Sequence, residues 1–307
     1  MSADIPVVSV VIPCYNQGKY LSEAVSSVQA QSRSDWECII VNDGSSDHTR
    51  DIALGLVSKD VRISYIEQAN GGLACARNRG LDLVRGAHVQ FLDADDQIAP
   101  DKFEKQLALL ECVPGLAVSY SDYMCYSDDP GITIAEGFRK PCLDERQPEL
   151  DIASHWGNEL CIPVHSFLFD ARIFSDYQIR FDEELSNHED FECWLRVFSL
   201  HPKILYVDDK LAFYRWHKDS ATQSAVRMMR GYILALSKAR SSGAYSPEVS
   251  KALGGRMRIV RSALRSRQIH WRILYAIRTR VRSLFYITGR LVKPRDGSVR
   301  GENGQWL

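Results

Sequence analysis

Apolar and polar positions alternate along the first third of the chain in blocks that predict strands and helices in turn. Short runs rich in β-branched residues predict buried strands, at residues 7–13, 36–43, 62–68 and 87–93. Apolar residues recur at helical spacing between these runs, which predicts helices at residues 19–31, 45–58 and 72–86. This alternation with short connections is typical of an α/β domain in which helices flank a mostly parallel central sheet.

The pattern is less regular after Pro100. The features predicted there are a helix at 102–112, a polar loop or lid at 127–151, an α+β segment at 160–216, a helix around 224–240 and a linker at 241–250. Within the α+β segment, "EDFECWLRVFSL" reads as a helix, and "KILYVDD" and "LAFYRWH" read as strands. We therefore expect one domain over residues 1–220 and a helical, basic C-terminal extension over 221–307.

Polar clusters follow three of the predicted strands, at residues 13–16, 42–47 and 93–96. In open parallel sheets the ligand site lies at the carboxyl ends of the strands, so these clusters are expected to converge on one rim. The last cluster brings Asp93, Asp95 and Asp96 together, and their mutual repulsion needs a compensating cause.

A divalent cation would remove that repulsion. Residues two apart in an extended segment point the same way, so Asp93 and Asp95 can present two carboxylates to one point. Carboxylate oxygens suit Mg²⁺ or Mn²⁺, and Mg²⁺ typically takes one or two carboxylates plus substrate phosphates. A helix N-terminus explains the same residues without a metal, because aspartate is a common and stabilising N-cap.

Two further stretches allow both a structural and a binding interpretation. Residues 42–47 can form a turn and a helix cap, and a buried aspartate such as Asp43 can also accept the imide N–H of a uracil or thymine ring. In "ANGGLACARNRG" a glycine pair, able to adopt positive φ, precedes Arg77. Arginine is the usual choice for pyrophosphate oxygens or a base carbonyl, and the structural alternative is a surface ion pair.

Composition adds a charge asymmetry. The 307 residues are 45% hydrophobic and 25% charged, with a formal net charge of −1, which is ordinary for a soluble globular protein. Residues 256–307 nevertheless hold 13 Lys or Arg and two acids, so the preceding residues are net acidic. The eight cysteines form no C-x-x-C pair and are interpreted as reduced thiols of a cytosolic chain.

No targeting or membrane-spanning segment is predicted. The first residues contain Asp4 and no positively charged segment, so a secretory signal is not expected. No apolar run reaches the roughly 18 residues that a bilayer span requires.

The basic tail has an amphipathic pattern over residues 256–295, which hold 12 basic residues and no acid. The apolar residues that share one helical arc are Ile273, Leu274, Ile277, Val281, Leu284, Phe285, Leu291 and Val292. Such an arginine-rich helix suits the anionic inner face of a membrane, although docking on the domain or at a dimer contact would bury the same arc. Nucleic-acid binding is disfavoured because the acidic body would be repelled.

Five motifs give the strongest indication of function. They are "IPCYN", "VNDGSSD", "NGGLACARNRG", "FLDADD" and a later "ED" followed by "WLR". In this order and spacing, the chain resembles a family 2 glycosyltransferase over roughly residues 6–220. The resemblance implies the GT-A fold, a Rossmann-like α/β architecture, with a nucleotide-binding half at about 1–100 and an acceptor-side half at about 101–220.

The resemblance also implies roles for individual residues. The donor nucleotide would be bound by Pro13, Tyr15, Asn16, Asp43, Arg77 and Asp93. Among these, Tyr15 would stack on the base, Asp43 would hydrogen-bond it and Asp93 would hold the ribose. A Mn²⁺ or Mg²⁺ ion on the diphosphate would be bound by Asp95, with Asp93 and His217 as further ligands. The structural alternative for His217 is simple packing.

Glu189 and Asp190 would supply the general base, with Asp190 preferred. Inverting transfer is a single attack by an acceptor hydroxyl on the anomeric carbon, and a carboxylate must take the hydroxyl proton. The same pair also fits the acidic first turn of a helix. One departure from the family lies at "YQIR" (177–180), where many members have glycines, and this puts the acceptor-side loop in doubt.

These observations lead to one expected function. The protein would be a metal-dependent inverting glycosyltransferase that moves a sugar from a nucleotide diphosphate sugar, with a UDP-sugar favoured, to a hydroxyl of a saccharide or lipid-linked acceptor. It would act in surface polysaccharide or glycolipid assembly, in the cytoplasm and peripheral on the inner face of the cell membrane, and a homo-oligomer is compatible with the sequence.

Two other functions are considered. The main alternative is a catalytically silent member that binds a nucleotide sugar or scaffolds an assembly complex. A dinucleotide-dependent oxidoreductase is disfavoured because no G-x-G-x-x-G follows a strand.

Overall fold

The computed structural model describes residues 5–129, 142–157, 159–218 and 224–287, with side chains described as far as residue 267. The chain divides into two compact units, Met1–Arg261 and Ser262–Leu307. The described part of the second unit is a helical run that ends at Ile287. Of the expected amphipathic segment, residues 268–287 are described only as helical backbone and residues 288–295 lie outside the described residues.

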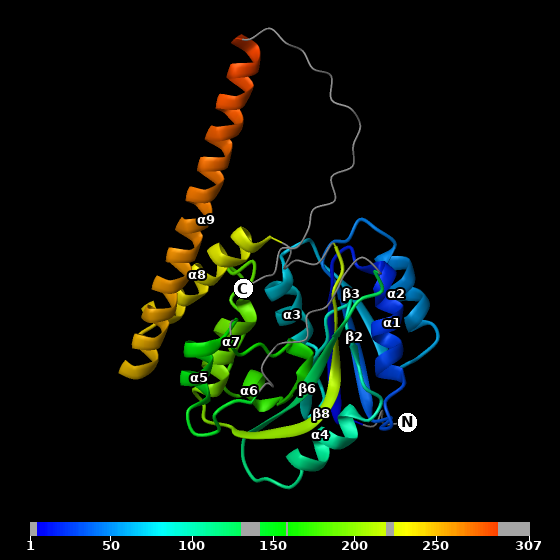
Figure 1. The fold of residues 1–307 in the computed structure, drawn as a ribbon. Coiled ribbons are helices and arrows are strands. Elements are labelled where there is room, and N and C mark those ends of the chain that lie inside the picture. The colour runs from blue at the N-terminus through cyan, green and yellow to red at the C-terminus, as the bar shows by residue number, and fades with distance from the viewer. Residues whose placement is uncertain (1–4, 130–141, 158, 219–223, 288–307) are drawn as a thin grey trace. The chain divides into compact units, whose positions relative to one another are not determined.

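The first half of the main unit alternates strands and helices as predicted (Figure 1). The elements are β1 (Val8–Cys14), α1 (Gly18–Gln29), β2 (Trp36–Asn42), α2 (Thr49–Val57), β3 (Ile63–Glu67), α3 (Leu73–Leu81) and β4 (His88–Phe91). Strands β3, β2, β1 and β4 are neighbours in that order and all pair in parallel. The carboxyl ends of β1, β2 and β4 therefore share one edge of the sheet.

The second half extends the same sheet. Its elements are β5 (Gln97–Ile98), α4 (Lys102–Leu110), β6 (Ala117–Tyr126), α5 (Pro148–His155), the 3₁₀ turn η1 (Val164–Ser166), β7 (Phe167–Asp170), α6 (Arg172–Ser175), α7 (Glu189–Phe198) and β8 (Lys203–Arg215). Among the described residues the sheet has eight strands in the order β3-β2-β1-β4-β7-β6-β8-β5. Strand β7 is antiparallel to β4 and to β6, whereas β6 and β8 are parallel. The expected α/β class with a mostly parallel sheet flanked by helices is confirmed.

Three expected element boundaries differ from the structure. The helix expected at 72–86 ends at Leu81, because the backbone of residues 85 and 86 turns back to donate to the Ser9 side chain. Strand β4 ends at Phe91, so Asp93 already lies outside the sheet. The helix expected from residue 45 begins at Thr49, where the Asp47 carboxylate accepts from the Thr49 amide.

Later boundaries differ as well. The two strands expected from "KILYVDD" and "LAFYRWH" form the single strand β8, and a register shift against β6 accommodates the polar residues between them. The end of the expected loop at 127–151 is helical, because α5 begins at Pro148. The chain continues with α8 (Ala225–Ser241) and α9 (Pro247–Ile287), so the link between these helices is shorter than the expected linker at 241–250.

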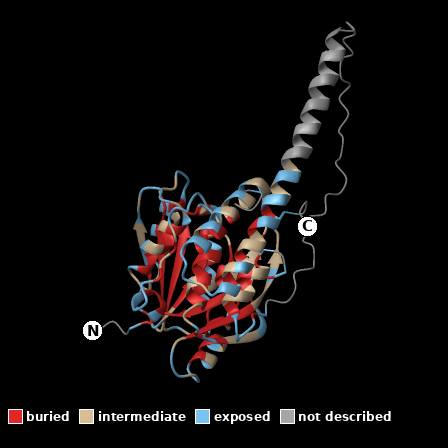
Figure 2. Ribbon diagram, turned by 90° about the vertical axis from the view of Figure 1, so that its left-hand side faces the viewer, coloured by how far each residue is buried: buried red, intermediate tan, exposed pale blue. Residues whose placement is uncertain are grey.

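Two apolar clusters cover the two faces of the sheet, and the strands of the sheet are largely buried (Figure 2). Successive side chains of a strand point to opposite faces, and accordingly Val10 and Ile12 join one cluster while Val11 joins the other. Helices α1, α2 and α4 pack on the first face. Helices α3, α5, α7 and α8 contribute to the second cluster, in which the Trp194 ring stacks on Phe169 at 4.6 Å between centroids. Buried Tyr232 and Leu236 make α8 part of this core, although the expected domain boundary at 220/221 precedes it.

Among the described residues, the helices include none that combines the length and the apolar character needed to cross a bilayer.

Close packing of α3 on β1 generates a stability prediction. An added Cβ at Gly80 would overlap the buried side chain of Val11, whereas a Cβ at Gly55 on α2 would meet no atom within 4 Å. We expect Gly80→Ala to lower the free energy of unfolding by about 1–3 kcal/mol through overpacking. Gly55→Ala should raise it by roughly 0.5–1 kcal/mol through helix propensity. Urea unfolding of the two variants measures both changes, and equal stability of the two variants would contradict the tight α3–β1 contact.

Candidate active site

The first polar cluster is joined to the second through Asn16. This residue adopts a left-handed conformation, with φ of 53°. Its side-chain oxygen accepts from the amide of Ser46 at 2.8 Å, and its own amide donates to the Ser45 hydroxyl at 2.9 Å. Pro13 is buried in β1, whereas the adjacent Tyr15 ring is 51% exposed. The strand end therefore presents an accessible aromatic side chain on a rigid loop.

Asp43 is buried and holds the glycine loop of the third motif. Its Oδ1 accepts from the Gly71 amide at 2.8 Å and from the Gln68 side chain at 2.8 Å, and its Oδ2 accepts from the Gly72 amide at 2.8 Å. Gly72 has φ of 90°, a conformation that favours glycine. Oδ2 accepts only one of these three bonds, so contact with a base remains a prediction that would use this oxygen.

Arg77 is not at the surface, which makes the surface ion-pair alternative wrong. Its guanidinium is 2% exposed and donates to Asp93 Oδ1 and to Glu189 Oε1, both at 2.7 Å. Burial disfavours the charged form, but the attraction of Asp93 and then Glu189 outweighs it and raises the pKa of Arg77 above its usual value. One arginine thus joins Asp93, which follows β4, to Glu189 at the start of α7, and these two residues are 96 positions apart in the chain.

Glu189 and Asp190 form the first turn of α7. Burial raises the pKa of Glu189, an effect that attraction by Arg77 opposes and the neighbouring Asp190 charge reinforces. Burial likewise raises the pKa of Asp190, again against the attraction of Arg77. Glu189 forms an ion pair with Arg77, whereas Asp190 Oδ1 accepts from the Phe191 amide in its own turn at 2.7 Å.

The three aspartates of the "DADD" segment point in different directions. Asp93 faces Arg77, and Asp95 Oδ2 lies 2.9 Å from His217 Nε2. Asp96 is buried and accepts from the Arg215 amide at 2.8 Å. Burial, and then repulsion by Asp95 and Asp93, raises the pKa of Asp96 well above its usual value.

Sequence reasoning did not identify Arg215, a buried residue that supports this segment. Its Nε donates to the Asp95 carbonyl at 2.9 Å, and its other nitrogens pair with Glu23 and Asp128. The guanidinium also lies over the Tyr20 ring, 4.7 Å from its centroid. Because Arg215 ends β8 two positions before His217, it fixes both sides of the Asp95–His217 pair.

The pair fits a divalent ion held mainly by a substrate. Among the described residues, no group of three or more His, Cys, Asp or Glu side chains is arranged to hold a metal. A Mg²⁺ or Mn²⁺ ion that takes one or two protein ligands plus phosphate oxygens does not require such a group. Asp95 and His217, which contact each other, would be the protein ligands of such an ion, whereas Asp93 Oδ1 accepts from Arg77.

Asn78 connects the third motif to Phe181, the residue that follows the segment in which the sequence departs from the family. Its side chain accepts from the Phe181 amide at 2.8 Å and donates to the Phe181 carbonyl at 2.9 Å. Arg196 on α7 donates to the Arg180 carbonyl at 2.6 Å. The end of the "YQIR" segment is therefore attached to α7 through Arg180, and the next residue, Phe181, is attached to α3. These two helices carry Asp190 and Arg77.

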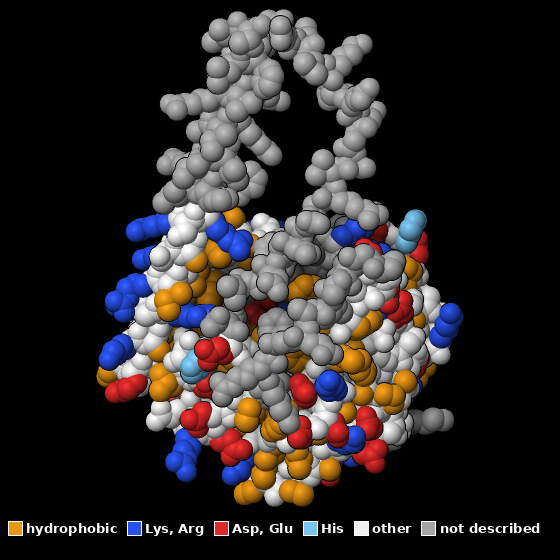
Figure 3. Space-filling view, in the orientation of Figure 1, with side chains coloured by type: hydrophobic (Ala, Val, Ile, Leu, Met, Phe, Trp, Pro, Cys, Tyr) orange, Lys and Arg blue, Asp and Glu red, His pale blue; other side chains and the backbone are white. Residues whose placement is uncertain are grey.

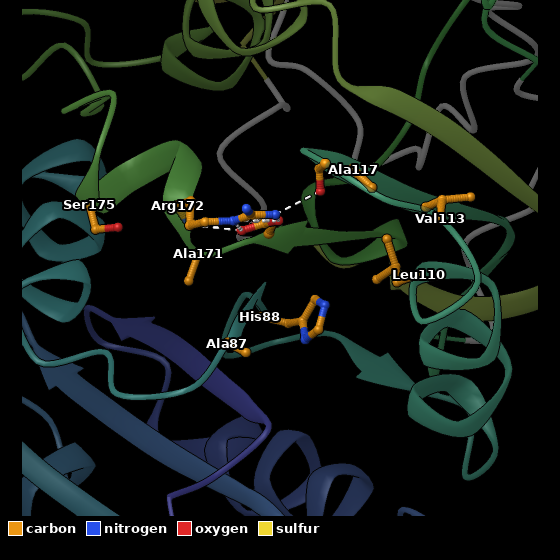
Figure 4. Close-up of a pocket in the computed structure, with 10 residues that line it drawn as sticks. Ala87, His88, Leu110, Val113, Ala117, Ala171, Arg172 and Ser175 are labelled. Carbon is orange, nitrogen blue, oxygen red and sulfur yellow. Dashed lines mark hydrogen bonds and ion pairs between the residues drawn. The ribbon is translucent and has the colours of Figure 1, made fainter.

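A hollow of about 350 Å³ lies elsewhere, at the amino end of β4 (Figure 4). His88 and Leu110 line it, and Arg172 is held there by the Asp170 carboxylate and the Gly115 carbonyl. None of the predicted site residues lines this hollow. The candidate site is accordingly the cluster at the carboxyl ends of β1, β2 and β4.

Solved structures with similar folds are glycosyltransferases. A complex of Staphylococcus aureus TarS residues 1–349 with UDP-GlcNAc has a TM-score of 0.60 and 20% identity, covering 75% of this chain and 66% of that one. The mannosyltransferase PcManGT of Pyrobaculum calidifontis, in complex with GDP-Man and Mn²⁺, has a TM-score of 0.63 and 15% identity, covering 88% and 75%. The fold is therefore GT-A.

Sequence comparison gives the family. Residues 9–168 match the family described as Glycosyl transferase family 2. The uncharacterized glycosyltransferase EpsJ of Bacillus subtilis is 30% identical over 227 residues, which cover 71% of this chain and 64% of EpsJ. The putative teichuronic acid biosynthesis glycosyltransferase TuaG of the same species is 43% identical over 126 residues, 40% of this chain and 49% of TuaG. The chain belongs to glycosyl transferase family 2, as the motifs predicted.

The buried Arg77 cluster generates a second stability prediction. Arg77→Met leaves the buried Glu189 carboxylate and the partly exposed Asp93 carboxylate without their cation, and removal of one partner of a buried pair typically costs about 3–5 kcal/mol. The single variant Glu189→Gln should cost less, because Arg77 keeps Asp93. In the double variant the loss should be smaller than the sum of the two single losses, as urea unfolding would show. Strict additivity would mean that Arg77 and Glu189 do not interact in the folded protein.

Proposed function

We propose that the protein is an inverting glycosyltransferase that moves a sugar from a nucleotide diphosphate sugar to an acceptor hydroxyl. The observation that carries the proposal is the Arg77 bridge, which sets the donor-side Asp93 and the acceptor-side pair Glu189–Asp190 around one guanidinium. A displacement reaction needs these two sides close together, because the attacking oxygen and the departing diphosphate occupy opposite faces of one carbon. Family membership supports the reaction class.

Asp190 is the proposed general base. Glu189 pairs with Arg77 and thereby anchors the start of α7, whereas the Asp190 carboxylate accepts from a backbone amide in its own turn. A raised pKa makes a carboxylate a stronger base, as long as it stays ionised at the working pH. Protonation of Asp190 at low pH should therefore remove activity. Because burial raises its pKa, the acid limb of the rate profile should lie above the usual range of an aspartate.

The donor is proposed to bind along the strand ends, with its base against Tyr15 and next to Asp43. A UDP-sugar is favoured because a carboxylate can accept the imide N–H of uracil. Among proteins of similar fold, TarS was solved with UDP-GlcNAc and PcManGT with GDP-Man. Binding of UDP and GDP should be compared directly, since guanine also offers N–H donors to a carboxylate.

Asp95 and His217 are proposed to hold Mn²⁺ or Mg²⁺ on the diphosphate. When bound, such an ion neutralises the charge that develops on the departing nucleoside diphosphate. Two further residues, Arg215 and Tyr20, keep Asp95 and His217 in place. Arg215 holds the Asp95 carbonyl, and the Tyr20 ring packs 4.9 Å from the His217 ring.

The acceptor is proposed to be a saccharide or a lipid-linked saccharide in surface polysaccharide or glycolipid assembly. The name of TuaG, which describes it as a putative teichuronic acid biosynthesis enzyme, supports this class of acceptor. A catalytically silent member that only binds nucleotide sugars is the alternative. The presence of both Asp95 and Asp190 at their motif positions favours the enzyme.

Substitution of the proposed base separates these two functions. We expect Asp190→Asn to lower transfer from a UDP-sugar, measured as UDP release with a lipid-linked saccharide acceptor and Mn²⁺, by about 10²–10⁴-fold. Calorimetry should show unchanged UDP binding, because Asp190 lies on the acceptor side. Asp176→Asn, at an exposed position on the second half of the domain, is the matched control and should leave turnover intact. Full activity in Asp190→Asn would remove Asp190 from the mechanism, and UDP binding without transfer by the unmodified chain would favour the silent alternative.

We further propose that the C-terminal helices attach the enzyme to an anionic membrane surface. Residues 225–261 contain eight Lys or Arg and a single acid, Glu248. Figure 3 shows Lys and Arg side chains gathered on the left-hand side of the main unit, where α8 and the beginning of α9 lie. Residues 262–295 add further arginines to this basic character. Basic helices of this kind gain about 1 kcal/mol per Lys or Arg near an anionic lipid surface.

Vesicle binding checks this attachment. The full chain should sediment with vesicles containing phosphatidylglycerol and not with purely phosphatidylcholine vesicles, and 0.5 M salt should release it because exposed charges are screened. A chain ending at Arg261, where the first compact unit ends, should bind more weakly. Equal binding to both kinds of vesicle would show that the basic residues serve another purpose.

A further inference from the structure

The residue immediately before the proposed base has a strained backbone. His188 precedes α7 with φ of 59° and ψ of 22°, the left-handed region, and its side chain makes no capping hydrogen bond. A non-glycine residue stays in this region only when its surroundings hold it there. The conformation of His188 decides the direction in which Glu189 and Asp190 enter the helix. Contacts that hold His188 in this conformation therefore also fix the positions of Glu189 and Asp190.

Helix α8 supplies that support through Tyr232. The Tyr232 ring stacks on the His188 imidazole, with 4.5 Å between centroids and 23° between planes, and meets the Phe191 ring edge-on at 5.1 Å. The Tyr232 hydroxyl donates to the Trp156 carbonyl at 3.0 Å, which fixes the ring. Tyr232 is 5% exposed and belongs to the core, and the half-buried His188 imidazole packs on it.

The preceding residue of α8 makes a second contact. An added Cβ at Gly231 would overlap the side-chain amide of Asn187, so this amide lies directly against the backbone of α8. Gly231 and Tyr232 thus contact Asn187 and His188 in succession. Further along α8, Lys238 pairs with Asp182 at 2.6 Å and with Glu184 at 2.5 Å. The whole segment 182–188 is attached to one helix.

We propose that α8 positions the catalytic base, with Gly231 and Tyr232 as the positioning residues. The inference rests on the proposed role of Asp190 and extends it to a helix outside residues 9–168, the part that matches the family. Glu189 must reach Arg77 at 2.7 Å, and a bulkier residue at position 231 would push Asn187 away from α8. Even a displacement of about 1 Å at a catalytic group can cost roughly 10²-fold in rate.

Two glycines, Gly231 and Gly255, offer a matched test in the 307-residue chain. Gly231→Ala places a methyl group against Asn187, whereas Gly255→Ala, in the interior of α9, meets no atom within 4 Å. Both changes have the same intrinsic effect on helix propensity. We expect Gly231→Ala to lower kcat for sugar transfer about 10²-fold with an unchanged Kd for UDP. Gly255→Ala should leave both values unchanged, and Asn187→Ala should restore part of the lost rate when combined with Gly231→Ala.

Hydrogen exchange gives a readout that does not depend on catalysis. Amides 187–191 should exchange faster in Gly231→Ala than in Gly255→Ala. If the unmodified chain transfers no sugar, the proposed function has failed, and faster exchange would still show that α8 holds this segment. Unchanged exchange and unchanged kcat in Gly231→Ala would overturn the inference. Weakening of UDP binding in parallel with kcat would also overturn it, because the whole fold would then be affected.

A second pair of variants covers the case in which Gly231→Ala does not fold. Tyr232→Leu removes the ring that stacks on His188, whereas Tyr232→Phe keeps the ring and loses only the hydroxyl bond to Trp156. We expect kcat to fall at least tenfold further in Tyr232→Leu than in Tyr232→Phe, with the Kd for UDP equal in both. Equal kcat in the two variants would overturn the role of the stack.

Discussion

The site depends on one buried cation. Arg77 has almost no contact with solvent, and two carboxylates from opposite halves of the domain converge on it. An arginine can remain charged in such a place only because Asp93 and Glu189 compensate the loss of hydration. The two carboxylates are close neighbours only because the arginine lies between them. The site is therefore complete only when both halves of the domain are folded against each other.

The motifs and the strand ends of the first half were predictable from the sequence, because period-2 and period-3.6 patterns are local properties. Residues 13–16, 42–47 and 93–96 do meet at one edge of the sheet, as the parallel order requires. Partners within the cluster were not predictable. The bonds from Asp43 to the glycine loop and from Arg77 to Glu189 join positions 28 and 112 residues apart. Local sequence patterns do not predict contacts between residues so far apart in the chain.

The roles of Arg215, Asn78 and α8 were missed for the same reason. The local sequence around Arg215 predicts only a strand. The pairing of β8 with β5 and β6 brings this residue into contact with the Asp95 carbonyl. The helix around 224–240 was expected, but not its attachment to residues 182–188, which rests on a glycine and a tyrosine ring. The strand break expected within β8 failed because a register shift absorbs the polar residues.

The strand order has a consequence for synthesis on the ribosome. Strand β4 has β1 on one side, and on the other it pairs with β7, which follows it by more than 70 residues. While the intervening chain is still emerging, the nascent N-terminal half exposes the unpaired edge of β4, a surface that invites non-native strand pairing. This edge is covered only after residue 170 has been synthesised, and until then the nascent polypeptide is prone to aggregation.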